Sequence, residues 1–176
     1  LRPYQKPHPP LWYGLSHLAG AEWAAANKVH VLANGPCDAT LPLFRRYRDA
    51  WQRTHGGAPM PKLGIGRHVV VAPSDAEAEA IARPAYAAWY ANLTKLWRDF
   101  GALPIRFARD FDEARARGIA VAGTPRLVRE ELEGQIPASG CTYLVCRLMF
   151  GGMSEVEAAA SIDLFADQIA AHIDRI

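Results

Sequence analysis

Apolar residues along the chain gather in short runs that are separated by longer amphipathic stretches. Four of these runs predict buried strands: the run that ends at Gly14, then Val29–Asn34, Leu63–Ala72 and Cys141–Met149. A further apolar run, Ile119–Gly123, lies between two predicted helices and is not counted among the strands. The stretches between the strands have helical periodicity, so strand and helix alternate four times.

Helix boundaries are marked by capping residues and glycines. Ser74–Glu77 and Ser154–Glu157 have the capping-box spacing and predict the starts of two helices. Asp38 or Thr40 is expected to cap the helix over about 41–54, which ends at Gly56. The last helix is expected to bury one face, formed by Ile162, Phe165, Ala166, Ile169 and Ile173.

Strands that alternate with helices pair in parallel, so the fold class is α/β with four βα units. Such a set forms either half of a (β/α)₈ barrel or a small open sheet. We expect a single domain over 1–176, with an irregular insertion at about 88–118. Its aromatic side chains either line a substrate mouth or pack in a core or interface.

Composition excludes several classes of protein. The 176 residues are 50% hydrophobic, and the net charge of +2 comes from interspersed charges, which argues against nucleic acid as a partner. We expect no membrane span and no signal peptide. Three cysteines without metal-ligand spacing indicate free thiols, and therefore a cytoplasmic protein without a metal site. The Pro-rich start at Leu1 suggests a piece of a longer chain.

The turn after Gly14 is the candidate functional site. Small residues there leave the N–H groups of Leu15–Ala19 uncovered at a helix N-terminus, where the helix dipole favours an anion. The Ser16 hydroxyl either joins such a site or caps the helix. His17 either contacts the ligand or faces solvent. Gly35 follows the second strand at the same edge of the sheet, as part of a binding site or as a plain turn.

Three charged residues on the later strands are weaker candidates. Arg67 and His68 are neighbours on one strand and point to opposite faces, and we expect structural roles for both. Arg147 lies late on its strand, where it either reaches a bound anion or forms a salt bridge.

Several segments together resemble the bacterial luciferase-like flavin-dependent monooxygenases. They occur in the family's order and span nearly the whole chain: Tyr4–Trp12, Gly14–Ala25, Arg67–Ala78, Gly123–Val128, Phe150–Met153 and Leu164–Ala166. The resemblance covers strands five to eight of the family's barrel, and the first four strands are missing.

The resemblance implies a TIM barrel that binds FMN, reduced by a separate flavin reductase, at the carboxyl ends of its strands. Such enzymes oxidise a small organic substrate with dioxygen, and a related branch uses the deazaflavin F420. The cofactor-binding residues implied here are Gly14, Leu15, Ser16, His17, Ala19 and Gly35. Catalytic residues stay unassigned, since the resemblance places most of them in the missing half.

Two alternatives stay open. One is a non-catalytic flavin-binding half-barrel. For this protein and for the monooxygenase alike we expect self-association or pairing with the missing N-terminal half, because an open half-barrel exposes two strand edges. The other is a serine hydrolase, since Ser16 follows a strand and opens a helix. The segment Gly14–Leu18 lacks the final glycine of the hydrolase motif, and Asp163, Asp167 and His172 lie in the last predicted helix.

Overall fold

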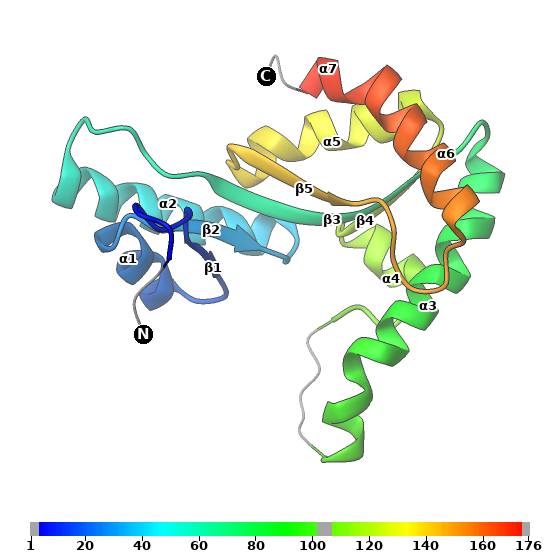
Figure 1. Ribbon diagram of the computed structural model, residues 1–176, viewed down its shortest axis with the longest axis horizontal. Coiled ribbons are helices and arrows are strands. Elements are labelled where there is room, and N and C mark those ends of the chain that lie inside the picture. Colours follow the sequence, from blue (N-terminus) through cyan, green and yellow to red (C-terminus); the bar gives the residue numbers. More distant parts are fainter. Residues whose placement is uncertain (1–3, 102–106, 174–176) are drawn as a thin grey trace. The chain divides into compact units, whose positions relative to one another are not determined.

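The computed structural model describes residues 4–101 and 107–173, and the chain divides into two compact units (Figure 1). The first unit comprises Leu1–Gly66 and Ile136–Val145, and the second comprises Arg67–Gln135 and Cys146–Ile176. Strands β3 (Leu63–Val71) and β5 (Tyr143–Arg147) contribute residues to both units.

The first unit is built on parallel strand pairs. β1 (Trp12–Gly14) pairs with β2 (His30–Ala33) in the register Trp12↔His30, and β2 pairs with the beginning of β3 in the register Leu32↔Gly64. Parallel pairing brings the carboxyl ends of β1 and β2 to the same edge of the sheet.

β5 lies on the edge of β3 that faces away from β2. The N–H of Leu63 donates to the Thr142 hydroxyl and its carbonyl accepts from the Thr142 N–H, whereas the Lys62 carbonyl accepts from Val31. Successive residues of a strand present their polar groups to opposite edges. The strand order in this unit is therefore β1-β2-β3-β5.

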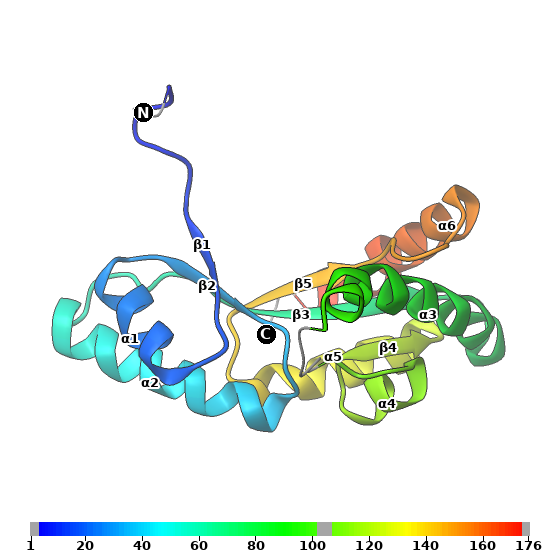
Figure 2. The ribbon, with the colours of Figure 1, turned by 90° about the horizontal axis from the view of Figure 1, so that it is seen from below.

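Helices α1 (Leu18–Ala26) and α2 (Cys37–His55) lie on one side of these strands (Figure 2). They bury the alternate strand residues Val31, Ala33, Leu63 and Ile65, which are at most 1% exposed. Tyr47 of α2 fixes the layer by donating its hydroxyl to the Val29 carbonyl at 2.9 Å. The α1–α2 layer therefore covers only one of the two faces of the sheet.

The second unit pairs the rest of β3 with β4 (Ala120–Gly123), parallel, in the register His68↔Ala120. Its helices are α3 (Asp75–Asp99), α4 (Phe111–Ala116), α5 (Pro125–Ser139, whose end belongs to the first unit), α6 (Glu155–Phe165) and α7 (Ala171–Ile173), with a π-helical segment η1 (Ala166–Ala170) between the last two. In Figure 1 the second half of α3 extends away from the strands.

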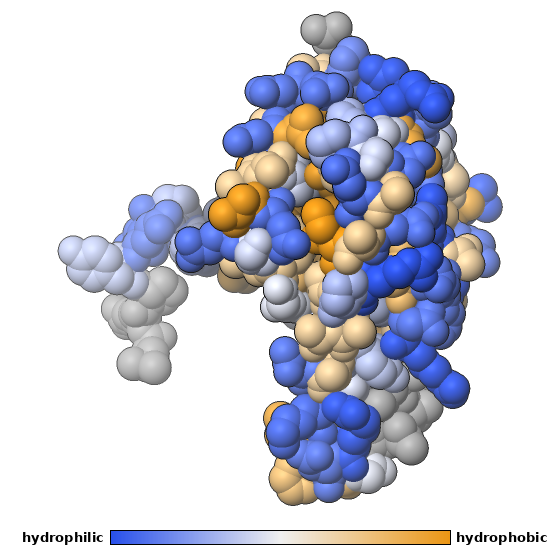
Figure 3. Space-filling model, turned by 90° about the vertical axis from the view of Figure 1, so that its right-hand side faces the viewer, coloured by the Kyte–Doolittle hydropathy of each residue, from blue (hydrophilic) through white to orange (hydrophobic). Residues whose placement is uncertain are grey.

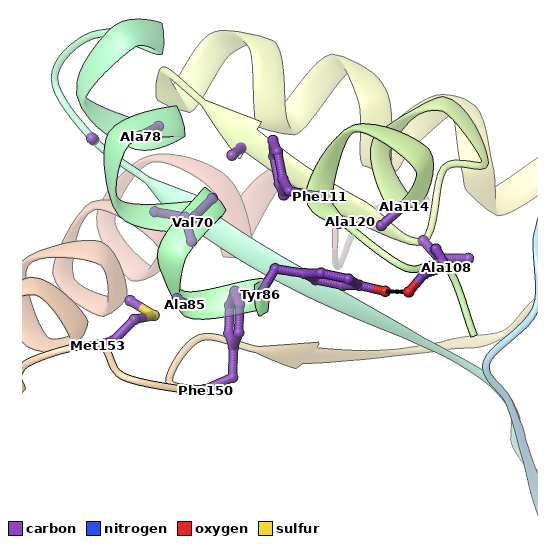
Figure 4. Packing of buried hydrophobic residues seen from close by; sticks show 14 of the residues in the cluster. Val70, Ala78, Ala85, Tyr86, Ala108, Phe111, Ala114, Ala120, Phe150 and Met153 are labelled. Carbon is purple, nitrogen blue, oxygen red and sulfur yellow. Dashed lines mark hydrogen bonds between the residues drawn. The ribbon is translucent and has the colours of Figure 1, made fainter. Parts of the chain in front are cut away.

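The core of the second unit packs β3 and β4 against α3 and α4 (Figure 4). Small residues such as Ala78 and Ala82 let α3 approach the strands closely, and Tyr86 and Phe150 fill the remaining space. The buried Tyr86 hydroxyl donates to the Ala108 carbonyl at 3.1 Å, so its polar end is satisfied. On the surface shown in Figure 3, apolar side chains form only small separate groups among hydrophilic ones.

The predicted α/β class with parallel strands is confirmed, and the described sheet has five strands because Ala120–Gly123 is a strand of its own. The predicted helix starts at Ser74 and Ser154 are confirmed, and Ser154 forms the full capping box with Glu157. At Ser74 the hydroxyl accepts from the Glu77 N–H at 3.3 Å and donates to the Glu77 carboxylate at 2.7 Å. The predicted cap of α2 is wrong. The helix begins at Cys37 after Pro36 and has no side-chain cap, so Asp38 and Thr40 lie in its first turn.

The predicted insertion at about 88–118 is largely helical where it is described. α3 continues to Asp99, and Phe111–Ala116 forms α4, while residues 102–106 lie outside the described part of the chain. Among its aromatics, Trp89 and Phe107 meet edge to face, and Trp97 stacks on Phe107. These contacts support packing within the unit. The prediction of one domain stays a prediction.

Candidate functional site

The turn between β1 and α1 is short, and part of its backbone is already bonded. Gly14 is the last residue of β1, and the N–H of the buried Leu15 donates to the Leu32 carbonyl at 2.9 Å. That N–H belongs to the sheet, so Leu15 offers no backbone donor to a ligand. Leu15 instead anchors the turn in the core through its side chain.

The N-cap of α1 is His17, so the interpretation of Ser16 as the cap is wrong. The Nδ1 atom of His17 accepts from the Gly20 N–H at 2.9 Å, while the backbone at His17 is extended. A Cβ atom at residue 20 would lie 2.9 Å from the His17 ring and 3.0 Å from the Tyr13 ring. Glycine at this position is therefore required for the cap, a role that sequence reasoning missed.

Four backbone donors stay unpaired at this turn. Within the described residues, the N–H groups of Ser16, His17, Leu18 and Ala19 have no protein acceptor, and these four residues are exposed. The Ser16 hydroxyl has no partner in that part of the chain either. Because His17 Nδ1 accepts a hydrogen bond, the proton of this ring lies on Nε2, which is a further donor beside the four N–H groups and the Ser16 hydroxyl.

Space and charge at the turn both suit an anion. Apart from the neighbouring residues Tyr13 and Leu15, no described residue has an atom within 4 Å of a Cβ built on Gly14, so the space beside this residue is open. The first turn of α1 contains no acidic residue. The next acidic side chain on this helix, Glu22, is paired with Arg46 and Arg53 of α2 at 3.3 and 3.7 Å. The positive end of the helix dipole is therefore not neutralised locally.

Gly35 lies two residues beyond β2, at the edge of the sheet where β1 also ends. It is partly buried, and its carbonyl accepts from the Thr40 hydroxyl at 3.3 Å. This contact ties the turn to the first helical turn of α2, which also carries Asp38. Of the six predicted cofactor-binding residues, five lie in one turn, and Gly35 lies at the same edge of the sheet.

The second unit buries Arg67 and His68 on opposite faces of β3. Arg67 is fully buried, and its Nε donates to Gln135 Oε1 at 2.5 Å. His68 meets the rings of Tyr86, Trp89 and Phe150 at centroid distances of 5.4, 4.3 and 4.7 Å. Both environments are packed interiors, in agreement with the structural roles expected from the sequence.

Burial also determines the protonation of the groups beside Arg67 and His68. It lowers the pKa of His68 to about 3, with a smaller contribution from the positive charge of Arg147, so the ring is neutral and is a poor general base. Burial raises the pKa of the Cys146 thiol to about 11, which keeps it protonated and unreactive. Arg147 is itself partly buried, and burial and Arg67 lower its pKa.

Neither a metal centre nor a catalytic triad is assembled in the described part of the chain. Its His, Cys, Asp and Glu residues form no group of three that would hold a metal ion, and its cysteines form no disulfide. Ser16 has no histidine within hydrogen-bonding distance, and His172 lies inside α7. The hydrolase alternative therefore lacks an activated nucleophile.

The chain belongs to the luciferase-like monooxygenase family, whose sequence profile matches residues 1–142. An uncharacterized protein of Sinorhizobium fredii, y4wF, is 34% identical over 160 residues, which are 87% of this chain and 45% of that protein. The β1–α1 turn lies inside the matched region.

Solved structures share the fold. The monooxygenase RslO1 from Streptomyces bottropensis superposes with a TM-score of 0.77 at 25% identity, over 98% of this chain and 51% of its own. The oxygenating constituent of 3,6-diketocamphane monooxygenase from Pseudomonas putida, solved in complex with FMN, superposes with a TM-score of 0.72 at 17% identity. The match covers 96% of this chain and 50% of that protein. A coenzyme F420-dependent reductase from Methanopyrus kandleri superposes with a TM-score of 0.62 at 12% identity. The match covers 93% of this chain and 50% of that protein.

The chain thus spans about half the length of these relatives, and its α/β fold matches about half of their luciferase-like TIM barrels. No described helix has both the length and the hydropathy that crossing a membrane requires.

Proposed function

We propose that this chain supplies the flavin-phosphate site of a luciferase-like flavin-dependent monooxygenase. One observation carries the proposal: within the described residues, four consecutive exposed N–H groups at the β1–α1 turn have no protein acceptor, and this turn lies in a segment that matches the family. Helix N-termini of this kind bind phosphate through backbone donors and the helix dipole.

Four residues of this site would contact the phosphate. The N–H groups of Leu18 and Ala19 donate to phosphate oxygens along the helix axis, and the Ser16 hydroxyl donates from the turn. His17 holds the helix start with Nδ1 and donates to the phosphate from Nε2. A hydrogen bond to a charged group contributes roughly 1.5–3 kcal/mol, so a few of them account for micromolar binding of the phosphate moiety.

FMN is the cofactor we propose, with F420 as the alternative, since relatives of both kinds share the fold. When bound and reduced, the flavin supplies the electrons that activate dioxygen for oxidation of a small organic substrate. The residues described above hold only its phosphate. The three cysteines form no disulfide with one another, which accords with a cytoplasmic location, and we propose that location as well.

Comparing FMN with riboflavin isolates the phosphate contribution, because the two ligands differ only in that group. We expect the chain to quench FMN fluorescence saturably. Riboflavin should bind at least about tenfold more weakly, which corresponds to a loss of about 1.4 kcal/mol or more of binding free energy. Ser16→Asp places a carboxylate among the donors and should abolish the difference. Gln52→Glu adds the same charge on the exposed surface of α2 and should preserve it.

A second variant tests the open space independently of charge. Gly14→Leu fills the region in which a Cβ meets no protein atom, so the fold should be retained while FMN binding is lost. Circular dichroism establishes the fold of each variant. Equal affinity for FMN and riboflavin in the parent chain, or unchanged FMN binding by Ser16→Asp and Gly14→Leu, would place the cofactor elsewhere.

A further inference from the structure

The sheet of the first unit has one face that the α1–α2 layer leaves uncovered. Register places Trp12, His30 and Gly64 on this face, opposite the residues buried under α1 and α2. Trp12 remains 44% exposed, whereas Val31 and Leu63, which point to the covered face, are completely buried. On the uncovered face exposure is therefore concentrated at Trp12, whereas His30 is partly buried and Gly64 is buried.

Aromatic rings form a continuous row across the uncovered face. The Trp12 ring lies 4.9 Å from the His30 ring and 5.4 Å from the ring of Tyr143, which is itself 39% exposed. A Cβ on Gly64 would lie 3.2 Å from Trp12, which shows that the indole covers this glycine. The Lys62 ammonium lies 4.1 Å from the Tyr143 ring centroid and ends the row. Large rings in mutual contact and half exposed to solvent are typical of protein interfaces.

The same unit has two open strand edges. In the order β1-β2-β3-β5, β1 and β5 each have one strand neighbour among the described residues. The Leu11 carbonyl accepts from the His30 N–H, and the Leu15 N–H donates to the Leu32 carbonyl, so Leu11 and Leu15 present their polar groups to β2. Polar groups alternate along a strand, and those of Trp12 and Gly14 therefore point to the outer edge. Open edges beside an apolar face favour strand addition.

We propose that a second copy of this chain docks on this face and pairs with both edges. The unit contributes four strands, and two copies related by a two-fold axis contribute the eight strands of a closed barrel. The β5 edge of each copy then pairs with the β1 edge of its partner, and the Trp12–Tyr143 rows of both copies fill the interior. In the closed barrel every strand edge of both copies is paired, so the assembly is a dimer and does not extend into a filament.

A self-association measurement with a matched pair of tryptophan variants tests this proposal. Sedimentation equilibrium of the 176-residue chain should give twice the monomer mass. Trp12→Lys places a charge within the interface and should raise the dimer dissociation constant by about 30-fold or more. Trp23→Lys makes the same change at a residue that is 52% exposed on α1 and should leave the constant unchanged.

A second variant keeps the test decisive if Trp12→Lys unfolds. Tyr143→Glu alters the other end of the aromatic row and should also dissociate the dimer while the far-ultraviolet circular dichroism is retained. A chain that stays monomeric at high concentration would overturn the proposal, as would open-ended oligomers. A monomer that associates only with a polypeptide carrying the N-terminal half of a relative would assign the face to that half. None of these outcomes depends on flavin binding.

Discussion

At the scale of single residues, His68 has a strong effect on the pH dependence of stability. Its Nε2 atom is buried without a hydrogen-bond partner in the described part of the chain, and burial lowers its pKa to about 3. The unfolded chain binds this proton near the usual pKa of 6.5, and the folded protein does not. The free energy of unfolding therefore falls as the pH drops from 6.5 towards 3.

Replacing this imidazole removes that dependence. Between pH 7 and pH 5 the parent chain should lose about 2 kcal/mol through His68, and His68→Phe, which keeps a ring among Tyr86, Trp89 and Phe150, should not. Urea denaturation at the two pH values measures the difference. His8→Phe, at an exposed histidine, is the control and should behave as the parent does. Equal losses in the parent and in His68→Phe would show that other groups cause the acid sensitivity.

The sequence predicted the location of the candidate site but not its hydrogen bonds. An apolar run, small residues and a helical pattern were enough to place Gly14, Ser16 and Ala19 at a strand–helix turn. Serine is a common helix cap, so a cap was one of the two roles predicted for Ser16, and the imidazole of His17 caps the helix instead. The Leu15 N–H donates to the Leu32 carbonyl and so is not available to a ligand. That hydrogen bond depends on strand register, which hydrophobic periodicity alone does not give.

At the scale of elements, the turn between β5 and α6 is locked against α3 by one glycine. Gly151 has a φ of +59°, and a Cβ there would lie 1.9 Å from the Ala85 carbonyl oxygen. Gly151→Ala should therefore destabilise the fold by about 3 kcal/mol or more, through both the strained backbone and the clash. Gly152→Ala should change stability by less than about 1 kcal/mol, because its Cβ meets only the Ala88 methyl group at 4.0 Å. Urea midpoints compare the two, and similar destabilisation would contradict the clash.

Elements with local signals were predicted well, and those fixed by tertiary contacts were not. The helix starts at Ser74 and Ser154 and the end of α2 at Gly56 have local sequence signals, and all three are confirmed. β4 is only four residues long and half alanine, and its fully buried pairing with β3 identifies it as a strand. In the last helix, the π-helical segment η1 changes the helical phase. Ile169 is consequently buried, whereas Ile162, predicted on the same face, is 43% exposed.

At the scale of the whole molecule, the chain matches about half of each of these two structural relatives, and it contains the β1–α1 turn that we propose binds the flavin phosphate. Binding energy for the phosphate should therefore be retained, whereas contacts to the flavin ring from the remaining strands should be missing. We expect FMN to bind this chain about 100-fold or more weakly than it binds the Pseudomonas putida diketocamphane monooxygenase component, a difference of about 2.7 kcal/mol.

The ratio of FMN affinity to riboflavin affinity should nevertheless agree within about threefold between the two proteins, since that ratio reports the phosphate alone. Calorimetric titration of both ligands into both proteins measures all four constants under one set of conditions. A chain that binds FMN as tightly as the longer protein would locate the ring contacts in this half. A chain with the weak affinity but no preference for FMN would show that the turn needs the remaining strands to adopt its phosphate-binding form.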